Sequence, residues 1–206
     1  MRILLGALAV VLAVVLWSVY RTHVNEQRLG EVESALAGRP VGVDCQSFVG
    51  GLVDIGWRAG EVEFDAAGRP GNKAFLTRKT CKDLEKLWRA DDKESVVGCV
   101  VHARLEADKL WAVCRSGASI AGSVKVLAHE AQHLRGITDE AAAECYGIES
   151  TAFTARALGA TEQQADALAE FAWLSLRYMP QSYVSPECHP GGELDLHPET
   201  TAWPSA

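Results

Sequence analysis

Two histidines and a glutamate stand at the spacing of a metal-binding helix. His129, Glu130 and His133 form the pattern H-E-x-x-H within the stretch LAHEAQHLRGITDEAAAECYG, residues 127–147. Residues four apart lie on one face of a helix, one turn from each other, so both imidazoles can bind one zinc ion. Glu130 then points toward the open coordination position, where a carboxylate can act as a general base. The pattern predicts a hydrolytic site with Zn2+ as its cofactor.

The residues around this motif favour a buried helix. Residues 126–128 before it and residues 131–132 within it carry no charge, whereas a solvated helix would more often carry Lys or Glu there. Buried imidazoles and a buried carboxylate need partners, because desolvating an unpaired polar group costs on the order of 1–3 kcal/mol. We therefore expect a metal site here rather than a satisfied polar cluster.

With these residues the chain resembles the zincin metallopeptidases. It also resembles uncharacterised bacterial membrane-anchored or exported proteins that carry H-E-x-x-H. The zincin likeness covers residues 124–147 and implies a peptide or protein substrate, with Glu130 activating a zinc-bound water. One position departs from the zincin pattern, because the second residue after the motif is usually hydrophobic and is Arg135 here.

Three acidic residues are candidates for the third protein ligand. Glu140 and Glu144 resemble the E-x-x-A-D element of gluzincins, in which the first glutamate binds zinc and the acid four residues later steadies a histidine. A second pattern, H-E-x-x-H-x-x-G-x-x-D, is similar to that of metzincins. It ends at Asp139 and would place Met179 below the site. The spacing to Glu140 is shorter than in gluzincins.

Helix geometry favours one of these candidates. Gly136 ends the first helix, so a second helix follows after a short turn. At about 1.5 Å per residue, His133 and Glu140 both lie about 3–4 Å from the turn, and His129 and Glu144 about 10 Å from it. Glu140 is therefore the expected ligand, with Glu144 hydrogen-bonded to His129 to fix its tautomer. Glu144 and Asp139 are the alternative ligands.

Three further polar side chains could donate a hydrogen bond to an oxyanion, and a structural role is the alternative for each. They are Tyr146, Arg135 and Tyr183. Three further histidines are expected outside the site: His102, His189 and His197.

A rival prediction comes from another class of protein. It is a non-catalytic, disulfide-stapled, membrane-anchored domain with a structural or vestigial metal site. Four protein ligands that close the coordination sphere would mark it.

The N-terminal segment predicts a membrane helix. No charged residue occurs from Ile3 to Tyr20, which is the minimal length for crossing a bilayer. No A-x-A-like cleavage site follows, so we expect an uncleaved signal-anchor rather than a cleaved signal peptide or a buried core helix. The expected product is a single-pass membrane protein, attached through residues 3–20, with its C-terminal domain outside the cytoplasm.

Length and charge limit the remaining classes. The 206 residues allow one domain with a core and an appendage. The formal net charge of -7 argues against a nucleic-acid partner, which needs a basic surface. We expect an anchor over residues 1–22, a stalk over 23–40 and a zincin-like metal-binding domain with an irregular C-terminal tail over 41–206.

The expected fold class is α+β and predominantly α. One N-terminal transmembrane helix precedes a small zincin-like domain with a β-hairpin or short sheet and an antiparallel pair of active-site helices. A strand is expected over Gly60–Asp65, a helix after Thr80 and a β-hairpin over Val96–Cys114. Helices follow from Ser123, with breaks at Gly136 and Gly159, and with Thr138 and Thr161 as caps.

Six cysteines, an even number, suit an oxidising compartment that could pair them. No Cys-x-x-Cys pair occurs, which argues against a thiolate zinc site. Some cysteines could instead be small buried apolar residues. The expected disulfides are Cys45–Cys81, Cys99–Cys114 across the hairpin, and Cys145–Cys188.

Overall fold

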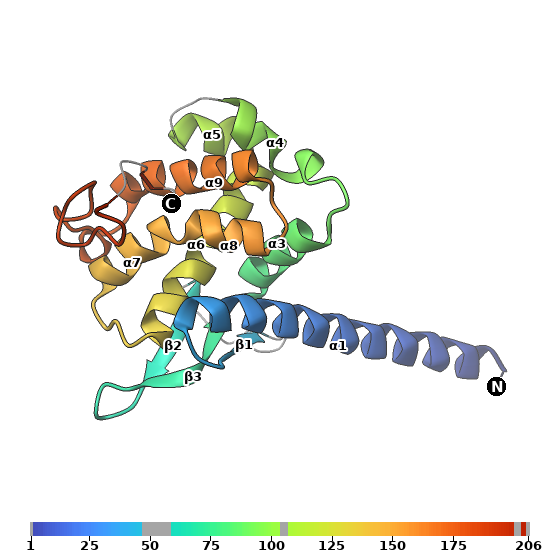
Figure 1. Ribbon diagram of the computed structural model, residues 1–206. Helices are drawn as coiled ribbons and strands as arrows, with labels where there is room; N and C mark the ends of the chain where they lie inside the picture. Colours follow the sequence, from blue (N-terminus) through green and yellow to red (C-terminus); the bar gives the residue numbers. More distant parts are fainter. Residues whose placement is uncertain (1, 47–58, 104–106, 200–202, 205–206) are drawn as a thin grey trace.

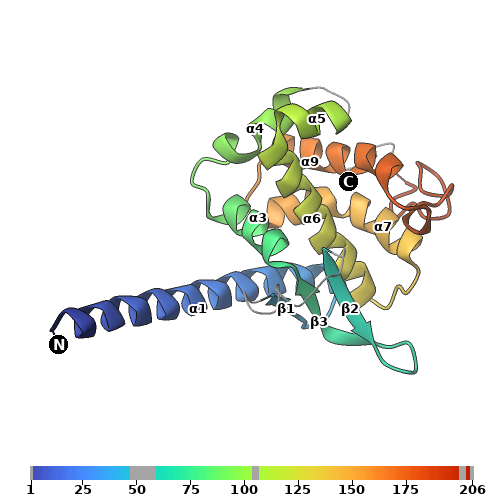
Figure 2. The same ribbon diagram turned by 180° about the vertical axis from the view of Figure 1, so that it is seen from behind.

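A central helix, α6 (Arg115–Leu134), carries the histidine motif and packs against most other elements (Figure 1). The computed structural model describes residues 2–46, 59–103, 107–199 and 203–204. Figure 2 shows α6 running from the α4–α5 end of the domain down to the sheet. Because α6 is surrounded, its polar residues Lys125, Glu130 and Gln132 are buried together with its apolar ones. The site motif therefore lies inside the protein.

The other helices and the strands are arranged around α6. In chain order the helices are α1 (Arg2–Ala37), α3 (Arg78–Arg89), α4 (Glu94–Ala103), α5 (Ala107–Val113), α7 (Glu140–Glu149), α8 (Thr151–Ala157), α9 (Glu162–Ser175), η1 (Leu176–Tyr178) and η2 (Gln181–Tyr183). The strands are β1 (Gly42–Cys45), β2 (Gly60–Phe64) and β3 (Pro70–Leu76).

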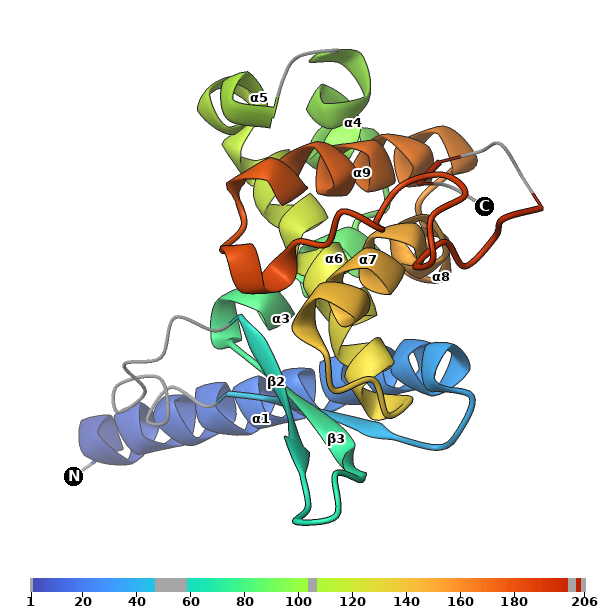
Figure 3. The ribbon, with the colours of Figure 1, turned by 90° about the vertical axis from the view of Figure 1, so that its left-hand side faces the viewer.

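The three strands form one sheet in the order β1-β3-β2, with β1 parallel and β2 antiparallel to β3. It lies next to α1 and the C-terminal end of α6 (Figure 3). Strand β2 confirms the alternating pattern from Gly60. Strand β3 was missed because it begins with Pro70 and Gly71, which are turn residues; burial of Ala74 and Leu76 holds it in the sheet. Among the described strands, β2 lies at an edge.

Helix ends follow local signals closely. Thr161 caps α9 with a capping box, as predicted. The helix expected after Thr80 is also confirmed, but it begins earlier, because Thr77 is its N-cap. The prediction that Thr138 caps α7 is wrong. Asp139 has that role, since its carboxylate accepts a hydrogen bond from the amide of Ala142 at 2.8 Å.

The predicted β-hairpin over Val96–Cys114 is wrong, because α4 and α5 occupy this region. An apolar β-branched run does not by itself distinguish strand from helix. In α4, Val97 and Val100 lie three residues apart and are both buried, and the helix packs against α6 and α9. Tertiary packing therefore decides the conformation here.

The three predicted disulfides are confirmed, with Cα–Cα distances of 6.0, 5.8 and 5.6 Å for Cys45–Cys81, Cys99–Cys114 and Cys145–Cys188. The second one joins α4 to the start of α6 rather than two strands. Three disulfides indicate an oxidising environment outside the cytoplasm.

The first helix, α1, has two different halves. Residues expected to form a stalk, 23–40, include Leu29 and Val32, which are buried in the main core. The N-terminal half extends away from the domain (Figure 1), and its described apolar side chains, such as Trp17 and Tyr20, are exposed.

The predicted transmembrane helix is overturned. Across the described part of the chain, no helix is long and apolar enough to cross a membrane. The uncharged run of α1 ends at Arg21, which pairs with Glu85 of α3 at 2.8 Å.

Candidate metal centre

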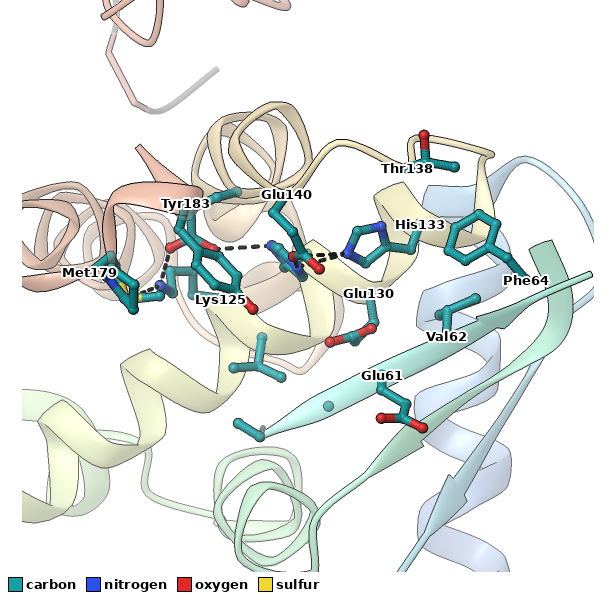
Figure 4. A pocket seen from close by; sticks show the side chains of 16 residues that line it. Glu61, Val62, Phe64, Lys125, Glu130, His133, Thr138, Glu140, Met179 and Tyr183 are labelled. Atoms are coloured by element: carbon teal, nitrogen blue, oxygen red, sulfur yellow. Dashed lines mark hydrogen bonds and ion pairs between the residues drawn. The ribbon is translucent and has the colours of Figure 1, made fainter. Parts of the chain in front are cut away.

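Three side chains from α6 and α7 converge on one point (Figure 4). The two imidazole nitrogens, Nε2 of His129 and Nε2 of His133, are 3.0 Å apart. Oε2 of Glu140 lies 3.3 Å from the first and 3.4 Å from the second. These three residues form the only group of at least three His, Cys, Asp or Glu within the described residues that could hold a metal ion.

Each histidine has a partner at its other ring nitrogen. Nδ1 of His133 donates to the carbonyl of Ile137 at 2.6 Å, and Nδ1 of His129 lies 3.0 Å from Oε2 of Glu144 in an ion-pair contact. The first bond depends on the turn at Gly136, whose φ of 104° suits glycine. Nε2 of each ring therefore faces the cluster.

The donor set fits zinc. Two nitrogen lone pairs and a carboxylate oxygen repel one another unless a cation lies between them. At metal–ligand distances of about 2.0–2.1 Å, tetrahedral ligands lie about 3.3 Å apart, which matches the separations of 3.0, 3.3 and 3.4 Å. His129, His133 and Glu140 could therefore hold a metal ion.

The electrostatics of the cluster also favour a positive charge. Burial lowers the pKa of His129, but the contacts with the carboxylates of Glu140 and Glu144 outweigh burial and raise the pKa to about 9. The contact with His129 lowers the pKa of Glu140 in turn. The metal-free cluster therefore holds a proton at neutral pH, and a metal ion must displace it.

Glu130 lies beside the cluster and against β2. Its side chain is buried and lines the same pocket, next to the strand in Figure 4. A Cβ atom on Gly60 would lie 2.6 Å from Oε1 of Glu130. A glycine is thus needed for the strand to approach the carboxylate this closely. Nearby, burial raises the pKa of Glu33 well above its usual range, and the charge of Glu130 raises it further.

The cluster opens into a cavity of about 620 Å³, a volume typical of ligand sites. Its apolar walls come from β2 and from the segment after α9, and they are formed by Val62, Phe64, Met179, Pro180 and Tyr183. The ring of Tyr183 lies 5.8 Å from that of His129, and the ring of Phe64 lies edge-on, 5.9 Å from that of His133.

The alternative ligands lie elsewhere or have other contacts. Asp139 caps α7 and is outside the converging group. Glu144 contacts His129 at Nδ1, the nitrogen that faces away from the cluster. Met179 lines the pocket, with its sulfur 3.7 Å from Nζ of Lys125.

Of the three candidate oxyanion donors, Tyr183 alone lines the pocket. Arg135 is exposed and donates to Oε1 of Gln132 at 2.9 Å. Tyr146, the third candidate donor, lies outside the cluster and the pocket. The three histidines expected outside the site also lie outside the cluster: His102, His189 and His197.

Three residues around the site were missed in the sequence. Lys125 precedes His129 by four residues, so the pattern K-x-x-x-H-x-x-x-H marks one helical face. Gly60 and Gly147 allow close approach to Glu130 and His129. A glycine carries no signal of what it will contact, so these two could not be found from spacing.

Gly147 makes the α6–α7 contact sensitive to a single methyl group. A Cβ atom there would lie 2.9 Å from the Cα atom of His129. We expect Gly147→Ala to destabilise the protein by about 1–3 kcal/mol and to weaken zinc binding. The matched control is Gly122→Ala on α6, where a Cβ atom would meet nothing within 4 Å. Denaturant unfolding and zinc titration test both variants. Equal effects of the two substitutions would contradict the role of Gly147 in the close contact between α6 and α7.

The C-terminal tail, which supplies one wall of the pocket, is fastened to α7. Cys145 binds Cys188, and Oε2 of Glu149 accepts a hydrogen bond from the amide of Leu196 at 2.9 Å. Burial raises the pKa of Glu149 to about 7, and the charge of Asp195 adds to this. Asp195 keeps the negative charge because its carboxylate accepts backbone hydrogen bonds, which lower its pKa.

This acid pair makes tail docking pH-dependent. The folded protein binds the Glu149 proton more tightly than the unfolded chain, so this stabilisation is present at low pH and is lost as pH rises toward and through about 7. We expect the Tm difference between wild type and Glu149→Gln to change by at least about 2 °C between pH 5.5 and 8. Glu162→Gln, in an exposed ion pair with Arg156, should show no such change. A constant difference for Glu149→Gln would contradict the raised pKa of Glu149.

Comparison of the chain with protein-family models gave no match. Comparisons with curated proteins and with solved structures gave none either. The resemblance to zincins therefore rests on the motif, and it stays a prediction.

Proposed function

We propose that the protein is a zinc-dependent hydrolase that cleaves peptide or amide bonds. The observation that carries this proposal is the convergence of two Nε2 atoms and Oε2 of Glu140 in a pocket that Glu130 also lines. Two histidines and a glutamate are a ligand set of catalytic zinc sites, which leave one coordination position open.

The residues have distinct roles in this reaction. Zinc, when bound, supplies Lewis acidity and lowers the pKa of a water toward about 7. Glu130 accepts the proton of the attacking water and delivers it to the leaving amine. Glu144 and the carbonyl of Ile137 orient the two imidazoles through their other ring nitrogens. Tyr183, which lines the same pocket, is the proposed donor to the developing oxyanion.

The pocket supports this function over a structural metal site. A structural zinc has four protein ligands, whereas the described residues bring three together. The cavity beside them has room for a substrate, and its walls of Val62, Phe64 and Pro180 suit an apolar side chain. The disulfides support a substrate outside the cytoplasm.

Metal removal tests the proposal. We expect the purified chain to contain about one zinc per molecule and to cleave members of a quenched fluorescent peptide library. A chelator should abolish cleavage, and added zinc should restore it, because Glu130 alone is a weak catalyst. Cleavage that survives complete zinc removal, or a zinc-loaded protein that cleaves no peptide, would refute the hydrolase assignment.

A further inference from the structure

Lys125 is a lysine buried at the wall of the candidate metal centre. The residue is only 6% exposed, although lysine is almost never buried unless it is paired. Its ammonium contacts Oε1 of Glu144 and lies 3.7 Å from the sulfur of Met179. Among the described residues that line the pocket, it is the only lysine or arginine.

The same glutamate contacts His129. Glu144 is 2% exposed, and its second oxygen, Oε2, lies 3.0 Å from Nδ1 of His129. One carboxylate thus bridges the ammonium of Lys125 and an imidazole that faces the cluster with its other nitrogen. Lys125, His129 and His133 are spaced by four residues on α6, so the ammonium, the imidazoles and the carboxylates of α7 lie on one interface.

Charge explains why the bridge needs the lysine. Removing one partner of a buried ion pair leaves an uncompensated charge, which is strongly destabilising. With Lys125 absent, Glu144 would keep a single partner, and its carboxylate would gain by turning away toward solvent. His129 would then lose the acceptor that orients its ring.

We propose that Lys125 is a positioning residue of the metal centre: it holds the Glu144 carboxylate beside Nδ1 of His129, so that Nε2 faces the metal. Lys125 acts through Glu144 and does not itself bind the metal. The inference rests on the metal site in the proposed function, but it does not depend on the hydrolytic reaction.

Zinc affinity in a double-mutant cycle tests this role. The full chain would be titrated with zinc against a chromophoric chelator at one fixed pH, as wild type, Lys125→Met, Glu144→Gln and the double variant. Loss of an outer-shell partner typically weakens metal affinity by about 10–100-fold, and we expect this for each single variant. The double variant should bind zinc within about threefold of Glu144→Gln, because Lys125 has no separate route to the metal.

Three further variants complete the test. Lys125→Arg keeps the charge and should retain most of the zinc affinity of the wild type. Lys125→Gln removes the charge and should lose as much affinity as Lys125→Met. It takes the place of Lys125→Met in the cycle if the methionine variant does not fold. Lys79→Met removes a lysine from another pair with a buried acid, Asp83, and should leave zinc affinity unchanged.

The outcomes separate this inference from the hydrolase assignment. Lys125→Met affinity within threefold of wild type would overturn the inference, as would an equal loss in the Glu144→Gln background. If the predicted coupling appears in a protein that cleaves no peptide, the inference stands and the hydrolase proposal fails.

Discussion

Replacing Glu130 with glutamine is expected to lower peptide hydrolysis by about 10²–10⁴-fold, the contribution typical of a general base. Glutamine has the same shape and can keep the contact with Gly60, but it cannot accept the proton of the attacking water. Zinc binding should be unchanged, because Glu130 lies outside the converging ligand group. The measurements are initial rates at saturating zinc and zinc content by mass spectrometry.

The control for this variant is Glu63→Gln. Glu63 lies on the same strand as Gly60, is exposed, and does not line the pocket, so the substitution removes the same charge without touching the site. It should retain wild-type rates. If Glu130→Gln retains more than about a tenth of the activity, another group is the base; if it loses its zinc, Glu130 has a structural role.

Replacing Glu140 with alanine is expected to produce the largest loss of metal. Its Oε2 lies close to both Nε2 atoms. Removing it leaves two ligands, so zinc affinity should fall by more than the roughly 10–100-fold typical of an outer-shell partner. Glu144→Ala should show that smaller loss. Zinc competition titrations of the two variants side by side measure the difference.

Asp139→Asn is the matched control for the ligand. Asparagine caps a helix about as well as aspartate, so α7 should keep its start while the neighbouring carboxylate is removed. We expect unchanged zinc affinity. A larger loss in Asp139→Asn than in Glu140→Ala would reassign the third ligand to Asp139 and contradict the geometry described above.

Much of the site was predictable because its signals are local. The four-residue spacing of His129 and His133 places them on one helical face, and Gly136 ends that helix at a predictable position. The rise per residue predicts Glu140 beside the near histidine and Glu144 beside the far one; in the structure Glu144 does lie beside His129, whereas Glu140 lies near both imidazoles. The three cysteine pairings were also predicted correctly, although the elements that carry one of them were not.

Other features depended on burial and on contacts between distant segments. The run from Val96 fits a strand or a helix equally well, and only packing against α6 and α9 makes it helical. The role of Lys125 requires a buried acid from α7, and that of Gly60 requires the side chain of Glu130. The predicted membrane helix was wrong, because no helix among the described residues is long and apolar enough to cross a membrane.

The sequence by itself determined which residues are candidates for binding a metal and how they are spaced along two consecutive helices, because hydrogen bonding and helix geometry act over a few residues. Only the tertiary structure decided which charges are buried, which glycines permit close contact and how the tail encloses the pocket. Those properties depend on neighbours that are distant in the chain, and the free energy of burial belongs to the assembled core rather than to any one segment.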